Sequence, residues 1–257
     1  MQKIYYNLYL SMKHFWTHKE KIPEGQGYGQ FSPAHYMTLG LTFLSIVFIV
    51  FLYVNAGPNE RIVILRMMSF TLILSDVFKT ILIACTDGVK VSDYLPLEAC
   101  SFGAYACFFD SLWPNNGILP LMLLTLFMPA AFLAVIFPTT TDLPVFNFYT
   151  IHQFLYHALI VAYGLARFAA GEVSLTFIGV WKAIAAFFVL AMIMYLIDTV
   201  FDKNFMFLRD AYDNALLSAI WKITGGGIAY VGGLFCFSIC VIHVFFLLFR
   251  LIEKLFL

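Results

Sequence analysis

The sequence predicts an all-α, polytopic membrane protein: a bundle of about seven transmembrane helices, preceded by an N-terminal amphipathic helix that lies in the membrane interface. Composition is the first observation, because 62% of the 257 residues are hydrophobic and only 12% are charged, against about a quarter charged in soluble domains. The second is that the apolar residues form unbroken runs of about twenty, the length that crosses a bilayer as a helix. Strands of a membrane barrel would instead alternate apolar and polar residues.

The N-terminal segment, residues 1–34, is expected to stay outside the hydrocarbon core, because lysines interrupt it repeatedly. Apolar residues nevertheless recur there at helical spacing: Tyr5, Leu8, Met12 and Phe15. This pattern is typical of an amphipathic helix on a membrane surface. The Pro- and Gly-rich stretch 23–33 then turns the chain into the bilayer. We therefore expect an interfacial segment over residues 1–34 and a transmembrane domain over residues 35–257.

Seven apolar segments follow, connected by short loops that leave no room for a soluble domain. They are Tyr36–Val54, Arg61–Cys85, Leu97–Trp113, Ile118–Phe137, Phe148–Ala169, Leu175–Phe201 and Gly226–Phe249. The third segment is the shortest and the most polar. The one longer connection lies between the sixth and seventh segments, and its stretch Phe205–Ala219 could form a second interfacial helix.

The distribution of basic residues predicts the orientation. Seven spans place the two termini on opposite sides, and a cytoplasmic N-terminus puts more of the lysines and arginines on the cytoplasmic face. The positive-inside rule therefore predicts a multi-pass protein of the cell membrane with its N-terminus in the cytoplasm. The formal net charge is zero, so no basic surface indicates a nucleic-acid partner.

Cysteine and histidine spacing indicates neither a disulfide framework nor a metal site. The chain has five cysteines, spread over or beside the apolar segments, which is not the pattern of a secreted disulfide scaffold. His152 and His157 do not share a helix face as two metal ligands would. We therefore expect no bound metal and no cofactor.

Ionisable side chains inside the apolar segments mark the candidate site, because burying them in lipid is costly. At a rise of about 1.5 Å per residue, His157 lies about 13 Å from the start of the fifth segment and Asp76 about 13 Å from the end of the second. Cys100 lies near the start of the third, and these three segment ends face the side of the N-terminus. The sequence thus predicts a polar pocket open to one membrane face. Asp76 and Lys79 could instead neutralise each other as an i, i+3 pair.

Cys100 has the surroundings of a reactive thiol. Pro96 can open a helix at its first turn, and a thiol near a helix N-terminus is favoured as the reactive thiolate. A histidine at matching depth, His157, could serve as its base. We therefore expect the sulfur and the imidazole to lie within about 5 Å of each other.

The sequence also resembles a known family. Residues 95–100, Leu-Pro-Leu-Glu-Ala-Cys, resemble the L-P-L-H-x-C motif of YwaF-like bacterial membrane proteins, which are relatives of transmembrane protein 164. Residues 154–160 resemble that family's F-x-x-H-x-L-I segment, and residues 204–208 resemble its N-Y-x-F-L element. Phe31 to His35 is similar to its F-x-x-x-H opening. The order and spacing of these elements match across nearly the whole chain.

The resemblance implies a membrane-embedded phospholipid acyltransferase with a cysteine nucleophile and a histidine. Carried over, Cys100 would attack an acyl ester and hold the chain as a thioester. His157 would take the thiol proton and then activate the acceptor hydroxyl. Membrane lipids would be the acyl donor and acceptor, and water as the acceptor would make the enzyme a lipid hydrolase. Asn204 would orient the histidine or bind the oxyanion or headgroup. Further candidates for substrate binding are Arg209, Asp76, Lys79 and His35.

The sequence departs from the family pattern at three places. Glu98 stands where the family has a histidine, Arg209 begins a step that lacks the family's proline, and glycines 225–227 replace a W-P pair. A carboxylate beside a thiol disfavours the thiolate unless a cation offsets it. Glu98 could instead hold His157 in the required tautomer and complete a triad. The sequence leaves both roles of Glu98 open.

Two other classes of function stay open. A polar pocket with Asp76, Lys79 and Asp110 would also suit the vestibule of a small-molecule or lipid transporter, although no inverted repeat or pair of broken spans supports one. The chain could also be a non-catalytic subunit of a membrane complex, for which the N-terminal interfacial helix would be useful. Flux that survives Cys100→Ala would favour transport.

Overall fold

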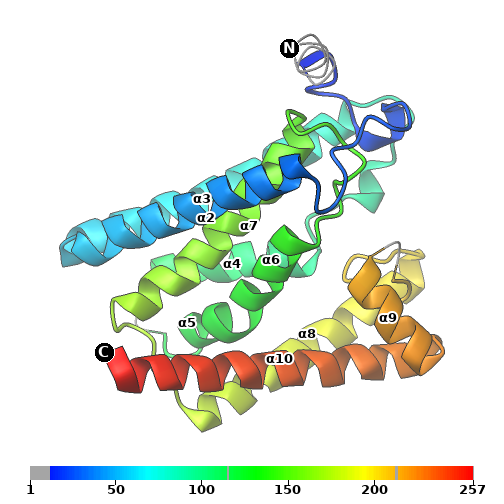
Figure 1. Ribbon diagram of the computed structural model, residues 1–257. Coiled ribbons are helices and arrows are strands. Elements are labelled where there is room, and N and C mark those ends of the chain that lie inside the picture. Colours follow the sequence, from blue (N-terminus) through cyan, green and yellow to red (C-terminus); the bar gives the residue numbers. More distant parts are fainter. Residues whose placement is uncertain (1–11, 115, 212–213, 257) are drawn as a thin grey trace.

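The computed structural model describes residues 12–114, 116–211 and 214–256, and within these ranges the chain is built from helices and loops without a β-strand (Figure 1). Of the predicted interfacial helix, residues 1–11 lie outside the described residues. The described remainder contains a short helical turn and the 3-10 helix η1, Lys19–Lys21. The Asn147 side chain donates to backbone carbonyls of this remainder, those of His14 and Thr17, at 2.7 and 2.9 Å. These bonds tie the N-terminal segment to the bundle.

All seven predicted apolar segments are helical, and their ends lie within a few residues of the expected ones, except that the last helix continues to Phe256. The helices are α2 Pro33–Asn55, α3 Pro58–Ala84, α4 Ala99–Leu112, the continuous run of α5 Leu119–Met122, the π-helix η3 Leu123–Phe127 and α6 Met128–Ile136, then α7 Phe148–Ala169, α8 Phe177–Phe201 and α10 Gly227–Phe256. The periodicity of the sequence therefore located the helices well.

Among the described residues, five helices are long and apolar enough to cross a membrane: α2, α3, the run from α5 to α6, α8 and α10. The chain is thus a membrane protein, but this measure does not give the expected seven spans. α4 has 14 residues, about 21 Å of helix, which is less than the ~30 Å of a hydrocarbon core. α7 has 22 residues, but it carries several polar side chains and is surrounded by protein more than by lipid.

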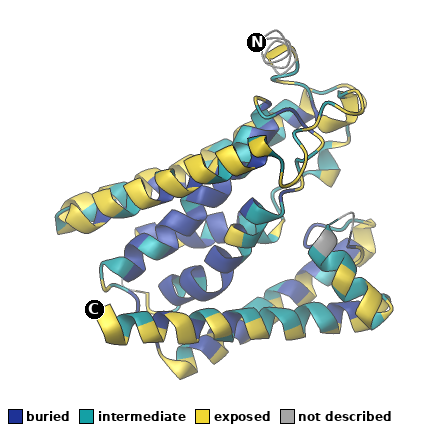
Figure 2. Ribbon diagram, viewed as in Figure 1, coloured by how far each residue is buried: buried dark blue, intermediate teal, exposed yellow. Residues whose placement is uncertain are grey.

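The position of α7 explains why it can be polar. It packs against α2, α3 and α6 and also contacts α4, and most of its side chains are buried (Figure 2). The outer helices behave differently, because large apolar side chains such as Phe48 on α2 and Leu196 on α8 are exposed. Such surfaces suit lipid, whereas the polar groups of α7 need partners inside the protein.

The helices form two unequal layers (Figure 1). One holds α2, α3, α4, α6 and α7. The other holds α8, α10 and the short helix α9, Ala215–Thr224. α10 contacts η3 and α6, and α8 contacts α5. Close packing around η3 is possible because Gly103 of α4 and Gly164 of α7 leave room for Phe127 and Met128, which lie 3.3 Å from where a Cβ would be.

The predicted second interfacial helix, Phe205–Ala219, is wrong in its bounds. Residues 205–209 form turns and bends, and the helix begins only at Ala215, where the side chain of the N-cap residue Asn214 accepts from the amides of Leu216 and Leu217. Asp202 and Phe207 both adopt left-handed backbone conformations, with φ of 52° and 57°, which an α-helix cannot contain. The loop 202–214 therefore connects α8 to α9.

Candidate active site

Cys100 and His157 meet where the first turn of α4 faces α7. Glu98 is the N-cap residue of α4, so that Cys100 falls at the second position of the helix. Its sulfur lies 3.0 Å from Nε2 of His157, within the distance that their matched depths predict. His157 is buried, whereas Cys100 is partly exposed. The pair therefore has the separation of a nucleophile and its base.

The other ring nitrogen of His157 decides its tautomer. Nδ1 lies 2.6 Å from the backbone carbonyl oxygen of Gln153, one helical turn earlier. A carbonyl oxygen can only accept a hydrogen bond, so this contact assigns the ring proton to Nδ1. Nε2 then faces the thiol with its lone pair and accepts the S–H group. In a neutral pair, His157 is thus arranged as a proton acceptor.

Glu98 does not occupy the third place of a triad, because the Gln153 carbonyl contacts Nδ1 of His157. The side chain of Glu98 is exposed at the start of α4 and lines a polar cavity beside Cys100. The sequence analysis did not predict this partner of His157, because every residue type carries a backbone carbonyl and none is distinguished by it.

Asp76 joins the three helices that surround the pair. Its Oδ2 accepts hydrogen bonds from the hydroxyls of Ser101, at 2.9 Å, and Tyr156, at 3.2 Å. These residues directly follow Cys100 and precede His157 in the sequence. Asp76 Oδ1 lies 2.6 Å from Nζ of Lys79, so the expected i, i+3 ion pair is present. The cluster fixes α3, α4 and α7 beside the pair and balances its own charge.

Two cavities meet at Cys100. The first is polar, measures about 130 Å³, and has Lys79, Glu98 and His152 among its lining residues. The second measures about 250 Å³ and is lined mainly by apolar side chains of α6, α8, α10 and the loop 202–214. Cys100, Thr139 and Gln153 line both. The thiol therefore lies at a boundary between polar and apolar space.

A comparison with protein families gives one match, the TMEM164 family, over residues 30–252. The chain belongs to the TMEM164 family. The matched region includes Cys100, His157 and the Asp76 cluster, and the resemblance read from the four motifs is confirmed. Comparisons with curated proteins and with solved structures give no match.

The remaining substrate-binding candidates of this TMEM164-family protein hold loops in place. His35 is fully buried. Its Nδ1 accepts from the Phe31 amide at 2.9 Å, so that Nε2 can donate to the Val135 carbonyl at 3.3 Å. Nδ1 thus fixes the segment that enters α2, and Nε2 joins the start of α2 to α6.

Asn204 and Arg209 bond within the loop 202–214 and to the end of α8. The Asn204 amide accepts from the Arg209 backbone and donates to the Asp210 carbonyl, and the Arg209 guanidinium donates to the Asp198 carbonyl and the Asp202 carboxylate. The next residues, 206–208, line the apolar cavity. Asn204 and Arg209 themselves line a separate polar cavity of about 430 Å³, whereas Asp76 and Lys79 lie beside Cys100.

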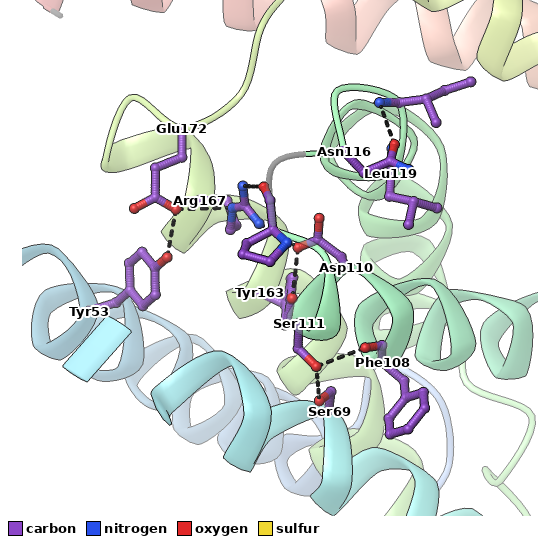
Figure 3. Close-up of polar contacts among 12 residues, drawn as sticks. Tyr53, Ser69, Phe108, Asp110, Ser111, Asn116, Leu119, Tyr163, Arg167 and Glu172 are labelled. Carbon is purple, nitrogen blue, oxygen red and sulfur yellow. Dashed lines mark hydrogen bonds and ion pairs between the residues drawn. The ribbon is translucent and has the colours of Figure 1, made fainter. Parts of the chain in front are cut away.

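A second polar cluster lies further along the same two helices (Figure 3). Asp110 of α4 accepts from Nη1 of Arg167 at 2.6 Å and from the Tyr163 hydroxyl at 2.8 Å. Arg167 also lies 3.0 Å from Glu172, which accepts from the Tyr53 hydroxyl of α2 at 2.6 Å. Asp110 therefore belongs to a cluster of its own and does not join Asp76 in one vestibule.

The depth argument could have found this cluster. Asp110 follows Cys100 by ten residues and Arg167 follows His157 by ten residues, so both pairs lie at matching depth on α4 and α7. Within the described parts of the chain, no three His, Cys, Asp or Glu side chains gather in a way that could hold a metal ion.

Proposed function

We propose that this protein is a membrane-embedded lipid acyltransferase that works through a thioester on Cys100. The observation that carries the proposal is the 3.0 Å contact between the Cys100 sulfur and His157 Nε2, with the histidine proton held on Nδ1 by the Gln153 carbonyl. Membership of the TMEM164 family supports a membrane protein of this kind. Membrane lipids are the proposed acyl donor and acceptor, with no cofactor.

In the first half-reaction, His157 Nε2 takes the thiol proton and the sulfur attacks the carbonyl carbon of a lipid ester. The bond between that carbon and the alcohol oxygen breaks, and the imidazolium returns its proton to the leaving oxygen. Acyl-Cys100 and a lysolipid result. The first amides of a helix have no intrahelical partner, so those at the start of α4 are the candidates for stabilising the negative oxygen of the intermediate.

The second half-reaction reverses these roles. His157 Nε2 takes a proton from the hydroxyl of an acceptor lipid, and the oxygen attacks the thioester carbonyl. The carbon–sulfur bond breaks and the thiolate regains its proton from the imidazolium. Water in place of the lipid hydroxyl would make the reaction a hydrolysis.

The polar cavity supplies the groups that would contact a lipid headgroup. Lys79 and Lys19 line it with the hydroxyl-bearing Thr139 and Thr140, and a lysine ammonium is a suitable partner for a phosphate. We propose the cell membrane as the location, with a cytoplasmic N-terminus. The polar cavity then opens to the cytoplasmic leaflet.

The test is intact-mass analysis of protein purified from membranes, combined with lipid turnover in proteoliposomes. Wild-type protein should carry an acyl adduct that peptide mapping locates at Cys100, and Cys100→Ala should lose both the adduct and turnover. Cys107→Ala, on the same helix, is the matched control and should keep both. Full turnover in Cys100→Ala would refute the thioester mechanism, and solute or lipid flux in that variant would favour a transporter.

A further inference from the structure

We propose that the apolar cavity beside Cys100 holds the acyl chain of the thioester and that one face of the continuous helix formed by η3 and α6, called the α6 face below, sets the chain length that fits. This inference rests on the proposed function and deepens it, because it assigns the specificity-determining residues. The residues are Leu126, Ala130 and Ala134.

The location of the cavity is the first argument. Ala99 and Cys100 line it at the start of α4, and the same cavity includes Phe187 of α8 and Ser238 of α10. Its walls are mainly hydrocarbon, whereas the cavity on the other side of Cys100 is lined by Lys79, Glu98 and other polar groups. A thioester at Cys100 would thus have its carbonyl at the boundary and its chain on the apolar side, where burying each methylene group is favourable by about 0.8 kcal/mol.

The depth of the cavity is the second argument. Thr139 and Gln153, which line both cavities, mark the end near the thiol. From Phe137 to Leu126, both of which line the cavity, the run of η3 and α6 covers about 16 Å. One leaflet contributes about 15 Å of the hydrocarbon core. The cavity therefore reaches as far as a lipid chain does in one leaflet.

Two alanines on one helix face leave space for the chain. Leu126 of η3 and Ala130 and Ala134 of α6 are spaced by four residues, about 6 Å apart along the helix. All three line the cavity. A larger side chain at each position would close the cavity at a different distance from Cys100.

The experiment measures the lengths of the acyl chains on Cys100 in three variants. Ala134→Leu closes the cavity nearest the thiol and should leave only the shortest chains. Ala130→Leu should remove chains of intermediate and greater length, and Leu126→Trp only the longest. For each excluded chain, we expect at least a tenfold fall relative to the chains that still fit, because one misfitting methylene in an apolar pocket changes discrimination by about 10- to 200-fold. Ala185→Leu, on the exposed side of α8, is the control and should leave the distribution unchanged.

A second measurement uses unsubstituted protein and does not depend on turnover. An alkyl methanethiosulfonate with a diazirine at its far end forms a disulfide with the Cys100 sulfur and releases methanesulfinate. After illumination, peptides that contain Cys100 should be cross-linked to residues of the deep wall, around Leu126 and Phe187. Cross-links to the polar wall, for example to Tyr149, would overturn the inference.

The two proposals fail in different ways. An adduct on Cys100 whose chain lengths are the same in all three variants would overturn the α6 face as the determinant of length and leave the thioester intact. Turnover that does not need Cys100 would end the acyltransferase proposal and the chain assignment with it. A graded change in length, with tethered cross-links to the deep wall, would establish the cavity as the acyl site.

Discussion

The two polar clusters on α4 and α7 are built from the same two helices and yet differ in kind. Cys100 at the start of α4 and His157 in the middle of α7 are uncharged in the arrangement described, and Cys100 borders two cavities. Ten residues further, Asp110 and Arg167 form a buried ion pair, reinforced by Tyr163 and Glu172. The first cluster has a basic lone pair opposite a thiol and space beside it. In the second cluster, the charged groups form ion pairs with each other.

The comparison teaches that an ionisable residue inside a membrane protein is not by itself a sign of chemistry. Burial cost demands a partner, and Asp110 meets that demand through Arg167. Asp76 does so through Lys79. The Cys100 cluster differs from the Asp110 cluster because it has open space next to a reactive atom.

The largest expected effect is on turnover at the first cluster. His157→Ala should lower lipid turnover by about 10²- to 10⁴-fold, the usual contribution of a general base. Cys100→Ser should be at least as severe, because a serine hydroxyl is far less ionised than a thiol at neutral pH. The double variant should be only slightly worse than either, since members of one catalytic unit are not additive. Turnover is measured in proteoliposomes by mass spectrometry, with thermal unfolding to show that the variants fold. If the loss of turnover in the double variant equalled the product of the two single losses, the two residues would not act in one shared step.

The next effect is on stability at the second cluster. Asp110→Asn should destabilise the protein, by at most about 3–5 kcal/mol, because it removes one of the two carboxylates that pair with the buried Arg167 charge. Turnover per folded molecule should change little. Thermal unfolding in detergent checks the first statement. A combined Asp110→Leu and Arg167→Met variant should recover much of the loss, since apolar replacements of a buried pair are often neutral. A large drop in turnover without a change in stability would place this cluster in the chemistry.

A smaller effect should come from Glu98→Gln, which sharpens the role of the polar wall. Because the Gln153 carbonyl occupies the triad position, removing the Glu98 charge should leave turnover unchanged or raise it, as a nearby carboxylate disfavours the thiolate. The measurement is turnover as a function of pH for Glu98→Gln and wild type. A clear fall in turnover would show that Glu98 holds the imidazolium after all.

The smallest effect concerns His18, which lies buried on the rim of the polar cavity and outside the spans. Burial lowers the pKa of His18 below its ordinary value, so the folded state favours the neutral ring. The resulting stability is present above the ordinary pKa of about 6.5 and is lost as the pH falls below it. The protection factors of the amides in residues 12–22, which correct for the intrinsic pH dependence of exchange, should therefore fall between pH 7.5 and 5.5. His18→Phe should remove this dependence, and an equal response in that variant would contradict the assignment.

The fold was largely predictable from the sequence because a lipid solvent leaves few choices. An apolar run of about twenty residues has to be a helix, and the predicted bounds of α7, 148–169, agree with the structure. The number of spans was harder, since apolar content does not distinguish a lipid-facing helix from one enclosed by protein. α4 and α7 are helices of the second kind, with most of their side chains enclosed by protein. The start of the second interfacial helix was also misjudged, because the left-handed conformation of Phe207 leaves no mark in the apolar pattern of residues 205–219.

The site was predictable in part. Depth placed Cys100 and His157 in the same half of the membrane, about 5 Å and 13 Å from the starts of their segments. Depth says nothing about rotation around the helix axis, so the contact of Asp76 with Ser101 and Tyr156 could not be foreseen. Asn204 and Arg209 match a motif, but their bonds are within the loop and to the end of α8.

The histidine of this site is oriented by a peptide carbonyl, and that has a consequence for how the site tolerates mutation. In a Ser-His-Asp triad, one codon change can remove the orienting acid. Here any residue that keeps α7 helical at position 153 supplies the same oxygen to His157. The orienting group is therefore present whenever α7 is helical. Replacing Gln153 by alanine would leave this carbonyl, and hence turnover, unchanged. Only a change that bends α7 next to this contact, such as Ala158→Pro, would reveal it.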